Sequence, residues 1–140
     1  MIIEFEVPFP PTLNHAWRRV GNHTVLAKAQ REYRQRVLRE MATTAWHDDD
    51  APLTALALPL LDRLAVALRF FPPDQRRRDL DNLPKAVLDA LTHAGLWRDD
   101  EQIDCLMLSR SEASPGNPRV VVRVWRYLSP EPYLLFSEAA

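Results

Sequence analysis

The spacing of hydrophobic residues predicts four main strands in this chain. We expect them at 2–7, 64–71, 102–109 and 119–127, with a shorter strand at 24–26. In the first segment apolar residues alternate with charged ones, and in the last Val120, Val122 and Val124 alternate with Arg119, Arg123 and Trp125. This is the period of a strand with one buried face. The segment LAVALRFF is apolar almost throughout and therefore predicts a central strand. Because the turn sequence SPGNP separates the last two segments, we expect them to form an antiparallel hairpin.

Two further segments have the spacing of amphipathic helices. In the first, at 27–46, the apolar stripe is expected to consist of Tyr33, Val37, Leu38, Met41, Ala42 and Ala45. In the second, at 82–93, the apolar side is expected to consist of Leu80, Leu83, Val87, Leu88 and Leu91. Pro84 is compatible with a first helical turn, where its missing N–H has no intrahelical partner. Gly95 is a suitable residue just after the helix end.

The remaining segments are expected to connect these elements. We expect a loop at 12–26 around the short strand, and a loop or linker at 47–60. At 140 residues the chain is most simply one domain. That domain is expected to span 1–128, followed by a C-terminal tail at 129–140.

Composition and charge exclude several classes of protein. The net charge is −1 and the pI is near 6.4, so contacts with nucleic acid would depend on local clusters of basic residues. The single Cys105 excludes an internal disulfide and a cysteine-based zinc site, and we expect it to be a small buried residue. The sequence shows no signal peptide and no apolar run of about 20 residues. We therefore expect a soluble, cytoplasmic protein with no membrane partner.

The densest cluster of candidate functional residues is RRRDLDNLPK at 76–85. Asp79 and Asp81 lie two positions apart, so in an extended segment their carboxylates would share a face and could bind one cation. Asp100 lies in a second acidic segment, RDDEQID at 98–104, which a strand–helix–strand excursion could bring near them. Mg²⁺ needs only one or two protein carboxylates, with water and phosphate oxygens as further ligands. The pattern favours a site for a divalent metal and a phosphate, and therefore phosphodiester chemistry.

Each of these residues also has a simpler structural explanation. Asp81 could cap the helix that follows it, and Asp99 with Asp100 could form a solvated turn. Asn82 could be the helix cap or could hold the aspartates in place. Lys85, one helical turn after Asp81, could neutralise a phosphate or could be an ordinary exposed lysine. Helix capping would account for only one of the four carboxylates, which are Asp79, Asp81, Asp99 and Asp100, so we favour the metal site.

Two groups of basic residues could contact nucleic acid. Arg76, Arg77 and Arg78 directly precede the carboxylates, where they are suited to gripping phosphates, although a solvated run is the alternative. Arg18 belongs to a second basic set at 17–31, which also contains a tryptophan. For this second set, an edge-packed tryptophan is at least as good an explanation.

Other combinations of reactive residues carry less weight. His47 precedes three aspartates at 48–50 and resembles a metal cluster by composition, but the ligand spacing is not regular. His93, near a helix end, is explained as a partner of the helix dipole. No Ser/His/Asp or Cys/His set stands out, and the sequence contains no glycine-rich phosphate loop.

At these residues the sequence resembles the RusA family of Holliday junction resolvases, small endonucleases of bacteria and their prophages. The resemblance is carried by RRRDLDNLPKAVLDALTHAGLWRDDEQID at 76–104 and, more weakly, by VPFPPTLNHAWR at 7–18. The long motif is specific because it combines two acidic clusters, an asparagine, a lysine and a helix end. With the flanking strands, the resemblance covers most of residues 1–127. Pro84 departs from the family, in which a non-proline residue is expected at this position.

The resemblance implies an α+β fold, a two-layer sandwich in which a small mixed β-sheet packs with two main helices, and a homodimer. It implies a Mg²⁺-dependent nuclease, with Mn²⁺ as a substitute, that acts on four-way junction DNA by paired, symmetric nicks in DNA recombination and repair. Paired incision needs two active sites at a fixed separation, which a two-fold dimer supplies. Such a protein would be encoded by a bacterium, a prophage or a phage.

The resemblance also implies roles for single residues. Matched position by position, the family's metal-binding carboxylates fall on Asp79, Asp81 and Asp100, and its catalytic lysine falls on Lys85. Whether Asp99 is a ligand stays open. The arginine run matches a basic segment of the family, but the resemblance transfers no individual DNA contact.

Three other functions are alternatives to junction cleavage. The first is a flap or general structure-selective DNA nuclease on the same scaffold. The second is a catalytically silent junction-binding protein, against which the intact set of carboxylates and lysine argues. The third is a phosphatase acting on small molecules, which would need a nucleophile motif after the N-terminal strand that this chain lacks.

Overall fold

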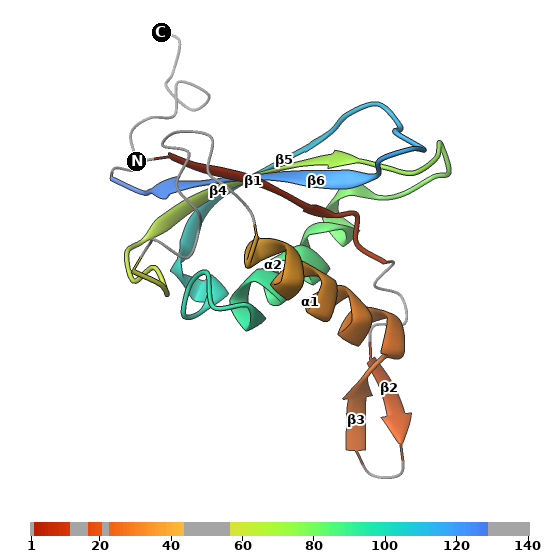
Figure 1. The fold of residues 1–140 in the computed structure, drawn as a ribbon, viewed down its shortest axis with the longest axis horizontal. Coiled ribbons are helices and arrows are strands. Elements are labelled where there is room, and N and C mark those ends of the chain that lie inside the picture. Colours follow the sequence, from red (N-terminus) through yellow and green to blue (C-terminus); the bar gives the residue numbers. More distant parts are fainter. Residues whose placement is uncertain (1, 12–16, 21–22, 44–56, 129–140) are drawn as a thin grey trace, which may run out of the picture.

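The computed structural model describes residues 2–11, 17–20, 23–43 and 57–128, with the backbone alone described for 17–20 and 23–26. It confirms an α+β fold in which two helices lie against one face of a four-stranded mixed sheet (Figure 1). The strands are β1 (Ile2–Pro8), β2 (Trp17–Val20), β3 (His23–Leu26), β4 (Leu64–Phe71), β5 (Ile103–Arg110) and β6 (Arg119–Arg126). The helices within the described ranges are α1 (Lys28–Met41), α2 (Pro84–His93) and the 3₁₀ helices η3 (Leu80–Asn82) and η4 (Asp100–Gln102).

The main sheet has the strand order β1-β6-β4-β5. β6 lies between β1 and β4 and pairs with both in antiparallel fashion, whereas β4 and β5 are parallel. The prediction of a central strand at 64–71 is therefore confirmed. The predicted antiparallel hairpin of the last two strands is wrong, because β4 lies between β5 and β6.

The connection from β5 to β6 passes the end of β4 and does not turn back directly. The Ser111 N–H donates to the Phe70 carbonyl at 2.8 Å, and the Ser114 N–H donates to the Pro72 carbonyl at 2.7 Å. These bonds hold the connecting residues 111–118 against the chain that leaves β4. The SPGNP sequence is thus part of a crossing between strands that are not neighbours.

α2 forms the crossover between the parallel strands β4 and β5, on the same side of the sheet as α1 (Figure 1). Pro84 is its first residue, as the missing N–H of proline predicts. Gly95 follows the helix with φ +83°, a left-handed conformation that favours glycine. η3 precedes α2, so the regular helix begins slightly later than the predicted range of 82–93.

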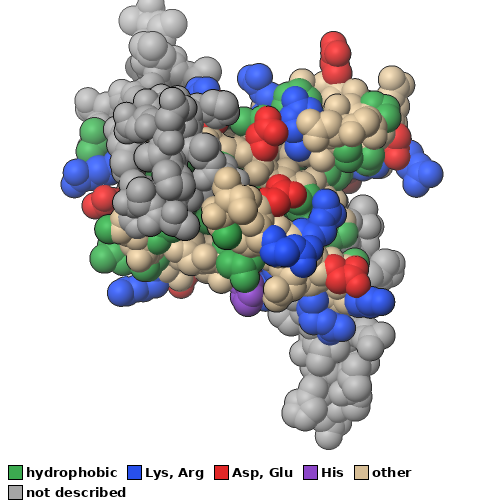
Figure 2. All heavy atoms as spheres, viewed as in Figure 1, with side chains coloured by type: hydrophobic (Ala, Val, Ile, Leu, Met, Phe, Trp, Pro, Cys, Tyr) green, Lys and Arg blue, Asp and Glu red, His purple; other side chains and the backbone are tan. Residues whose placement is uncertain are grey.

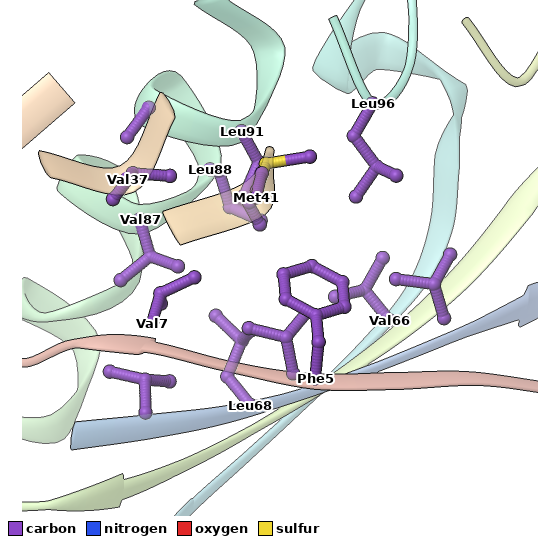
Figure 3. Close-up of a cluster of buried hydrophobic side chains, with 14 of the residues drawn as sticks. Phe5, Val7, Val37, Met41, Val66, Leu68, Val87, Leu88, Leu91 and Leu96 are labelled. Carbon is purple, nitrogen blue, oxygen red and sulfur yellow. The ribbon is translucent and has the colours of Figure 1, made fainter. Parts of the chain in front are cut away.

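The hydrophobic core lies between the sheet and the two helices (Figure 3). The strands contribute Ile3, Phe5, Val7, Val66, Leu68, Phe70, Val120, Val122 and Val124. The helices contribute Tyr33, Val37, Met41, Val87, Leu88 and Leu91. The predicted alternation of the first and last strands is therefore confirmed, with one side of each buried. The buried Tyr33 hydroxyl donates to the Pro8 carbonyl at 2.8 Å, which connects α1 to the end of β1.

Neither helix covers the opposite face of the sheet (Figure 1). On that face the Arg123 Nε of β6 donates to the Glu4 Oε2 of β1 at 2.7 Å. β5 is an edge strand, and its Leu106 and Met107 are 40% and 42% exposed. Cys105, which was expected to be buried, is only half-buried because it belongs to this edge strand.

The apolar stripe of α1 is narrower than predicted. Tyr33, Val37 and Met41 are buried, but Leu38 is 40% exposed and Ala42 is also exposed. A helical position advances by about 100° per residue, so the side chain after Val37 points away from the buried stripe. The helix itself ends at Met41, before the end of the predicted range.

The segment predicted as a loop at 12–26 contains an additional strand. β2 pairs with β3 in antiparallel fashion, and the pair projects beyond α1, away from the main sheet (Figure 1). The predictions for Ala45, for His47 with the aspartates at 48–50, and for the tail at 129–140 lie outside the described residues. Among the residues that are described, no helix is long and apolar enough to span a bilayer.

Candidate functional site

η3 connects the arginine run to α2, and the first two candidate carboxylates lie at its start and within it. Asp79 precedes η3 in an extended conformation, and Asp81 is its second residue; both side chains are exposed. The N-cap residue of α2 is Leu83, which makes no side-chain cap. The alternatives in which Asp81 or Asn82 caps this helix are therefore wrong. Their polar groups face solvent at the start of α2, where a cation or a phosphate could reach them.

Lys85, in the first turn of α2, contacts two carboxylates with its ammonium group. Its Nζ lies 3.0 Å from Asp89 Oδ1 and 3.5 Å from Asp100 Oδ2. The hydrogen bond to Asp89 is the largest cause that raises the pKa of Lys85 above its ordinary value, and the charge of Asp100 adds to it. The structure thus places the lysine and the third candidate carboxylate in direct contact.

Asp99 has a structural role that its neighbour does not share. Its carboxylate accepts a hydrogen bond from the Glu101 N–H at 3.0 Å, while its own N–H donates to Gln102 Oε1 at 3.0 Å. Together these bonds form a capping box at the start of η4. The bond from the Glu101 N–H is the largest cause that lowers the pKa of Asp99. Capping therefore accounts for this carboxylate, whereas Asp100 faces Lys85.

Gln102 is buried and fixes η4 to the segment that precedes β4. Its Oε1 accepts from the N–H groups of Arg98 and Asp99 at 2.9 and 3.0 Å. Its Nε2 donates to the carbonyls of Leu60 and Asp62 at 2.9 and 3.0 Å. The four bonds satisfy both donors and both acceptor sites of the amide. The buried Gln102 side chain therefore holds the loop that carries Asp100 in place.

Arg63 anchors the same loop from its exposed side. Its Nε donates to Asp104 Oδ2 at 2.9 Å, and its Nη2 makes a further contact with Asp104 Oδ1. The same guanidinium donates to Glu101 Oε1 at 3.0 Å and to the Glu101 carbonyl at 2.8 Å. Its hydrogen bonds hold the pKa of Asp104 below the usual range. The position of η4 therefore depends on contacts from residues that precede β4.

The three arginines before Asp79 lie in different surroundings. The Arg78 side chain is 14% exposed; its Nη1 lies 2.8 Å from Asp74 Oδ1 and its guanidinium lies 5.6 Å from the centre of the Phe9 ring. It holds the loop between β4 and η3 together. Arg76 is 85% exposed, and Arg77 is exposed as well. Arg76 and Arg77 are therefore the members of the run that can reach a phosphate.

The arginine run lines an open pocket of about 520 Å³. Asp79 and Arg110, the last residue of β5, also line it, and Arg110 Nη1 donates to the Arg78 carbonyl at 2.6 Å. On the face shown in Figure 2, the Lys and Arg side chains of the described residues lie interspersed with Asp and Glu side chains. The positive charge available to a polyanion at this site is therefore local, as the net charge of −1 requires.

The candidate carboxylates, which all lie in described segments, do not form a compact metal-binding cluster. Among the residues that the structure describes, no three His, Cys, Asp or Glu side chains are grouped closely enough to hold one. β4 and β5 are parallel, so the end of β4 and the start of β5 lie at opposite ends of the strands, and Asp100 approaches the start of α2 through its contact with Lys85. The exposed oxygen donors of Asp79 and Asp81 still fit Mg²⁺, which needs few protein ligands.

Sequence reasoning missed two charged residues of this region, Asp89 and Arg110. The signal for Asp89 was its position four residues after Lys85, which puts the two on one helical face. Arg110 had no such signal, because its place beside the arginine run follows from the pairing of β4 with β5. Arg18 lies on β2, where only the backbone is described.

The chain is similar to known proteins over most of its length. The family model Endodeoxyribonuclease RusA matches residues 8–125. The crossover junction endodeoxyribonuclease rusA of Enterobacteria phage HK97 is 35% identical over 116 residues, which covers 81% of this chain and 86% of the phage protein. The crossover junction endodeoxyribonucleases RusA of Escherichia coli strain K12 and Shigella sonnei strain Ss046 are each 39% identical over 97 residues, covering 69% of this chain and 72% of each relative.

These matches identify the class of the protein as that of the endodeoxyribonucleases. Within this class, the chain belongs to the RusA family. The family match includes β4, α2 and β5 and therefore contains every described candidate site residue. The resemblance carried by the 76–104 motif is thereby confirmed.

Proposed function

We propose that this protein is an endonuclease that resolves four-way DNA junctions by Mg²⁺-dependent hydrolysis of phosphodiester bonds. The observation that carries the proposal is the contact of Lys85 with Asp100, since Lys85 lies in the helix that directly follows η3 and its exposed Asp81. This contact supports the proposal that residues from both ends of the β4–α2–β5 crossover belong to one site. Membership of the RusA family, whose relatives are named crossover junction endodeoxyribonucleases, supports the choice of substrate.

In this proposal the residues of the site have separate roles. Asp79, Asp81 and Asp100 would hold the metal ion, with Mn²⁺ able to replace Mg²⁺. When bound, the ion would neutralise phosphate charge and lower the pKa of a bound water. Lys85 would place its ammonium beside the phosphoryl or leaving oxygen, where negative charge develops.

Other polar groups would contact the substrate. The exposed Arg76 and Arg77 would bind DNA phosphates along the pocket that leads to Asp79. Arg78 is proposed to support them indirectly, because its guanidinium is committed to the loop. Asn82 and Arg18 are proposed as further contacts with DNA.

We propose a homodimer acting in DNA recombination and repair in the cytoplasm of a bacterial cell. The relatives come from phages and enterobacteria, which supports this setting. Two nicks placed symmetrically need two sites at a fixed distance, which a two-fold dimer would provide. Sedimentation of the purified protein should therefore show one species of about twice the 16.2 kDa chain mass.

The proposal is tested by incubating the protein with a labelled four-way junction, a matched duplex and a flap, with and without Mg²⁺. Paired nicks confined to the junction and dependent on Mg²⁺ are expected. Equal cutting of all three substrates would favour a general structure-selective nuclease. Binding without cutting would favour the catalytically silent alternative.

Replacing one exposed carboxylate should separate catalysis from binding. We expect Asp81→Asn to lower the junction cleavage rate by at least about 10³-fold, because a metal ligand supplies several kcal/mol of transition-state stabilisation. The dissociation constant for the junction should change little, since arginines contact the phosphates. Gel-shift and cleavage assays on the same preparation measure both quantities.

The matched control for this variant is Glu32→Gln on α1. It also removes one exposed negative charge but lies outside the site, so it should cut at the wild-type rate. Loss of junction binding together with cleavage in Asp81→Asn would show that the aspartate is structural.

A further inference from the structure

Asp89 lies beside Lys85 but has no role in the proposed cleavage reaction. It lies one turn after Lys85 on α2, and its carboxylate is the nearest partner of the Lys85 ammonium, at 3.0 Å. Asp100, the second partner, comes from η4 and is 3.5 Å away. The ammonium is therefore held between a carboxylate of its own helix and one delivered by the chain after that helix.

This pair differs from an ordinary ion pair on a helix surface. On α1, Lys28 and Glu32 have the same spacing, but their atoms are 3.7 Å apart and their side chains are 81% and 63% exposed. Asp89 is only 26% exposed. In both pairs the lysine precedes its acidic partner, which is the less favourable order for helix stability. The contact with Asp89 is thus better suited to fixing the lysine than to stabilising the helix.

A bound cation would change the two contacts of Lys85 in opposite ways. If Asp100 binds Mg²⁺, part of its negative charge is neutralised and the cation repels the ammonium nearby. Asp89, on the same helix as Lys85, is not one of the proposed metal ligands. It would then be the group that keeps the long, flexible lysine side chain beside the site.

We propose that Asp89 is a positioning residue that holds the Lys85 ammonium in place for the cleavage step. The inference rests on the proposed function, in which Lys85 stabilises charge on the reacting phosphate. Asp89 itself makes no contact with the substrate in this assignment. Its effect on the reaction passes through Lys85 alone.

The first test compares single-turnover cleavage of a labelled four-way junction at saturating Mg²⁺. We expect Asp89→Asn to lower the rate about tenfold without changing the junction dissociation constant, because correct placement of a charged group governs the chemical step. Asp89→Glu, which keeps the charge, should return the rate to within about threefold of wild type. Glu32→Gln, which breaks the equivalent pair on α1, should cut at the wild-type rate.

The second test repeats Asp89→Asn in a Lys85→Ala background. Residues that act as a unit have non-additive effects, so the second substitution should cause no further loss. A full tenfold loss in this background would overturn the inference while leaving the proposed function intact. Failure of the wild-type protein to cut any junction would instead refute the proposed function itself.

Two further measurements separate positioning from other roles of Asp89. The Mg²⁺ concentration for half-maximal cleavage should be unchanged in Asp89→Asn, and the thermal midpoint should stay within a few degrees of wild type. A raised Mg²⁺ requirement would make Asp89 a metal ligand and overturn the inference. A large fall in the midpoint, with full activity regained on cooling, would show a structural role and also overturn it.

Discussion

Arg76 and Arg78 are two residues apart, yet their guanidinium groups lie in different surroundings. Arg78 is largely covered, pairs with Asp74 and lies over the Phe9 ring, whereas the Arg76 side chain is 85% exposed. Asp99 and Asp100 differ in the same way, since one caps η4 and the other faces Lys85. At the scale of residues, local contacts decide which charges hold the protein together and which remain available to a ligand.

This difference predicts opposite effects of two arginine substitutions. Arg78→Ala should lower the thermal midpoint by about 4 °C, because it removes a partly buried ion pair and a ring contact. Arg76→Ala should leave the midpoint unchanged, weaken junction binding and reduce the slope of log K against log salt by about one. Thermal unfolding and salt-dependent binding of both variants measure these effects. A lower midpoint in Arg76→Ala, with an unchanged midpoint in Arg78→Ala, would contradict the prediction.

At the scale of elements, η4 is a three-residue helix that other parts of the chain hold in place. Gln102 ties it to the carbonyls of Leu60 and Asp62, and Arg63 ties it through Glu101 and Asp104. A 3₁₀ helix of this length has little stability of its own. The position of the candidate carboxylate in η4 therefore depends on the segment before β4.

Removing the buried amide should test this dependence. Gln102→Ala leaves two N–H groups and two carbonyls without their partner, so we expect a loss of about 2–4 kcal/mol in the free energy of unfolding. Cleavage should fall as well, because η4 would no longer hold its carboxylate beside Lys85. Urea unfolding gives the first quantity and a junction assay below the melting range gives the second. A stable variant with wild-type activity would contradict this role.

How far the sequence predicts this structure depends on the range of the interactions involved. The strands at 2–7 and 64–71 and the helix at 82–93 follow from local periodicity. The pairing of β5 with β4 does not, because a turn sequence such as SPGNP is equally compatible with a hairpin and with a crossing past one strand. In the site, the motif at 76–85 follows from the sequence, whereas the contact between Lys85 and Asp100 depends on the fold, because Asp100 comes from η4, beyond the helix.

At the scale of the whole molecule, the core and the candidate site are separate parts. The core lies between the helices and the inner face of the sheet, and its residues are apolar (Figure 3). The carboxylates of the site are exposed or half-exposed and lie outside it. The fold should therefore not require a metal ion.

Removal of divalent cations should therefore stop cleavage without unfolding the protein. With EDTA we expect no nicking, an unchanged far-ultraviolet circular dichroism spectrum and a thermal midpoint only a few degrees lower, since a weakly bound ion stabilises only by mass action. Addition of excess Mg²⁺ should restore cleavage. Loss of the spectrum in EDTA would show that the metal has a structural role.

The place of β6 in the sheet has a consequence for synthesis on the ribosome. Of the four strands of the main sheet, β1 is made before the others, whereas its partner β6 is made after them, and β6 also joins β1 to β4. Contacts between residues so distant in sequence form slowly and leave strand edges open meanwhile. The nascent chain must therefore carry an unpaired β1 until β6 leaves the exit tunnel, and the sheet beneath the candidate site can be completed only then.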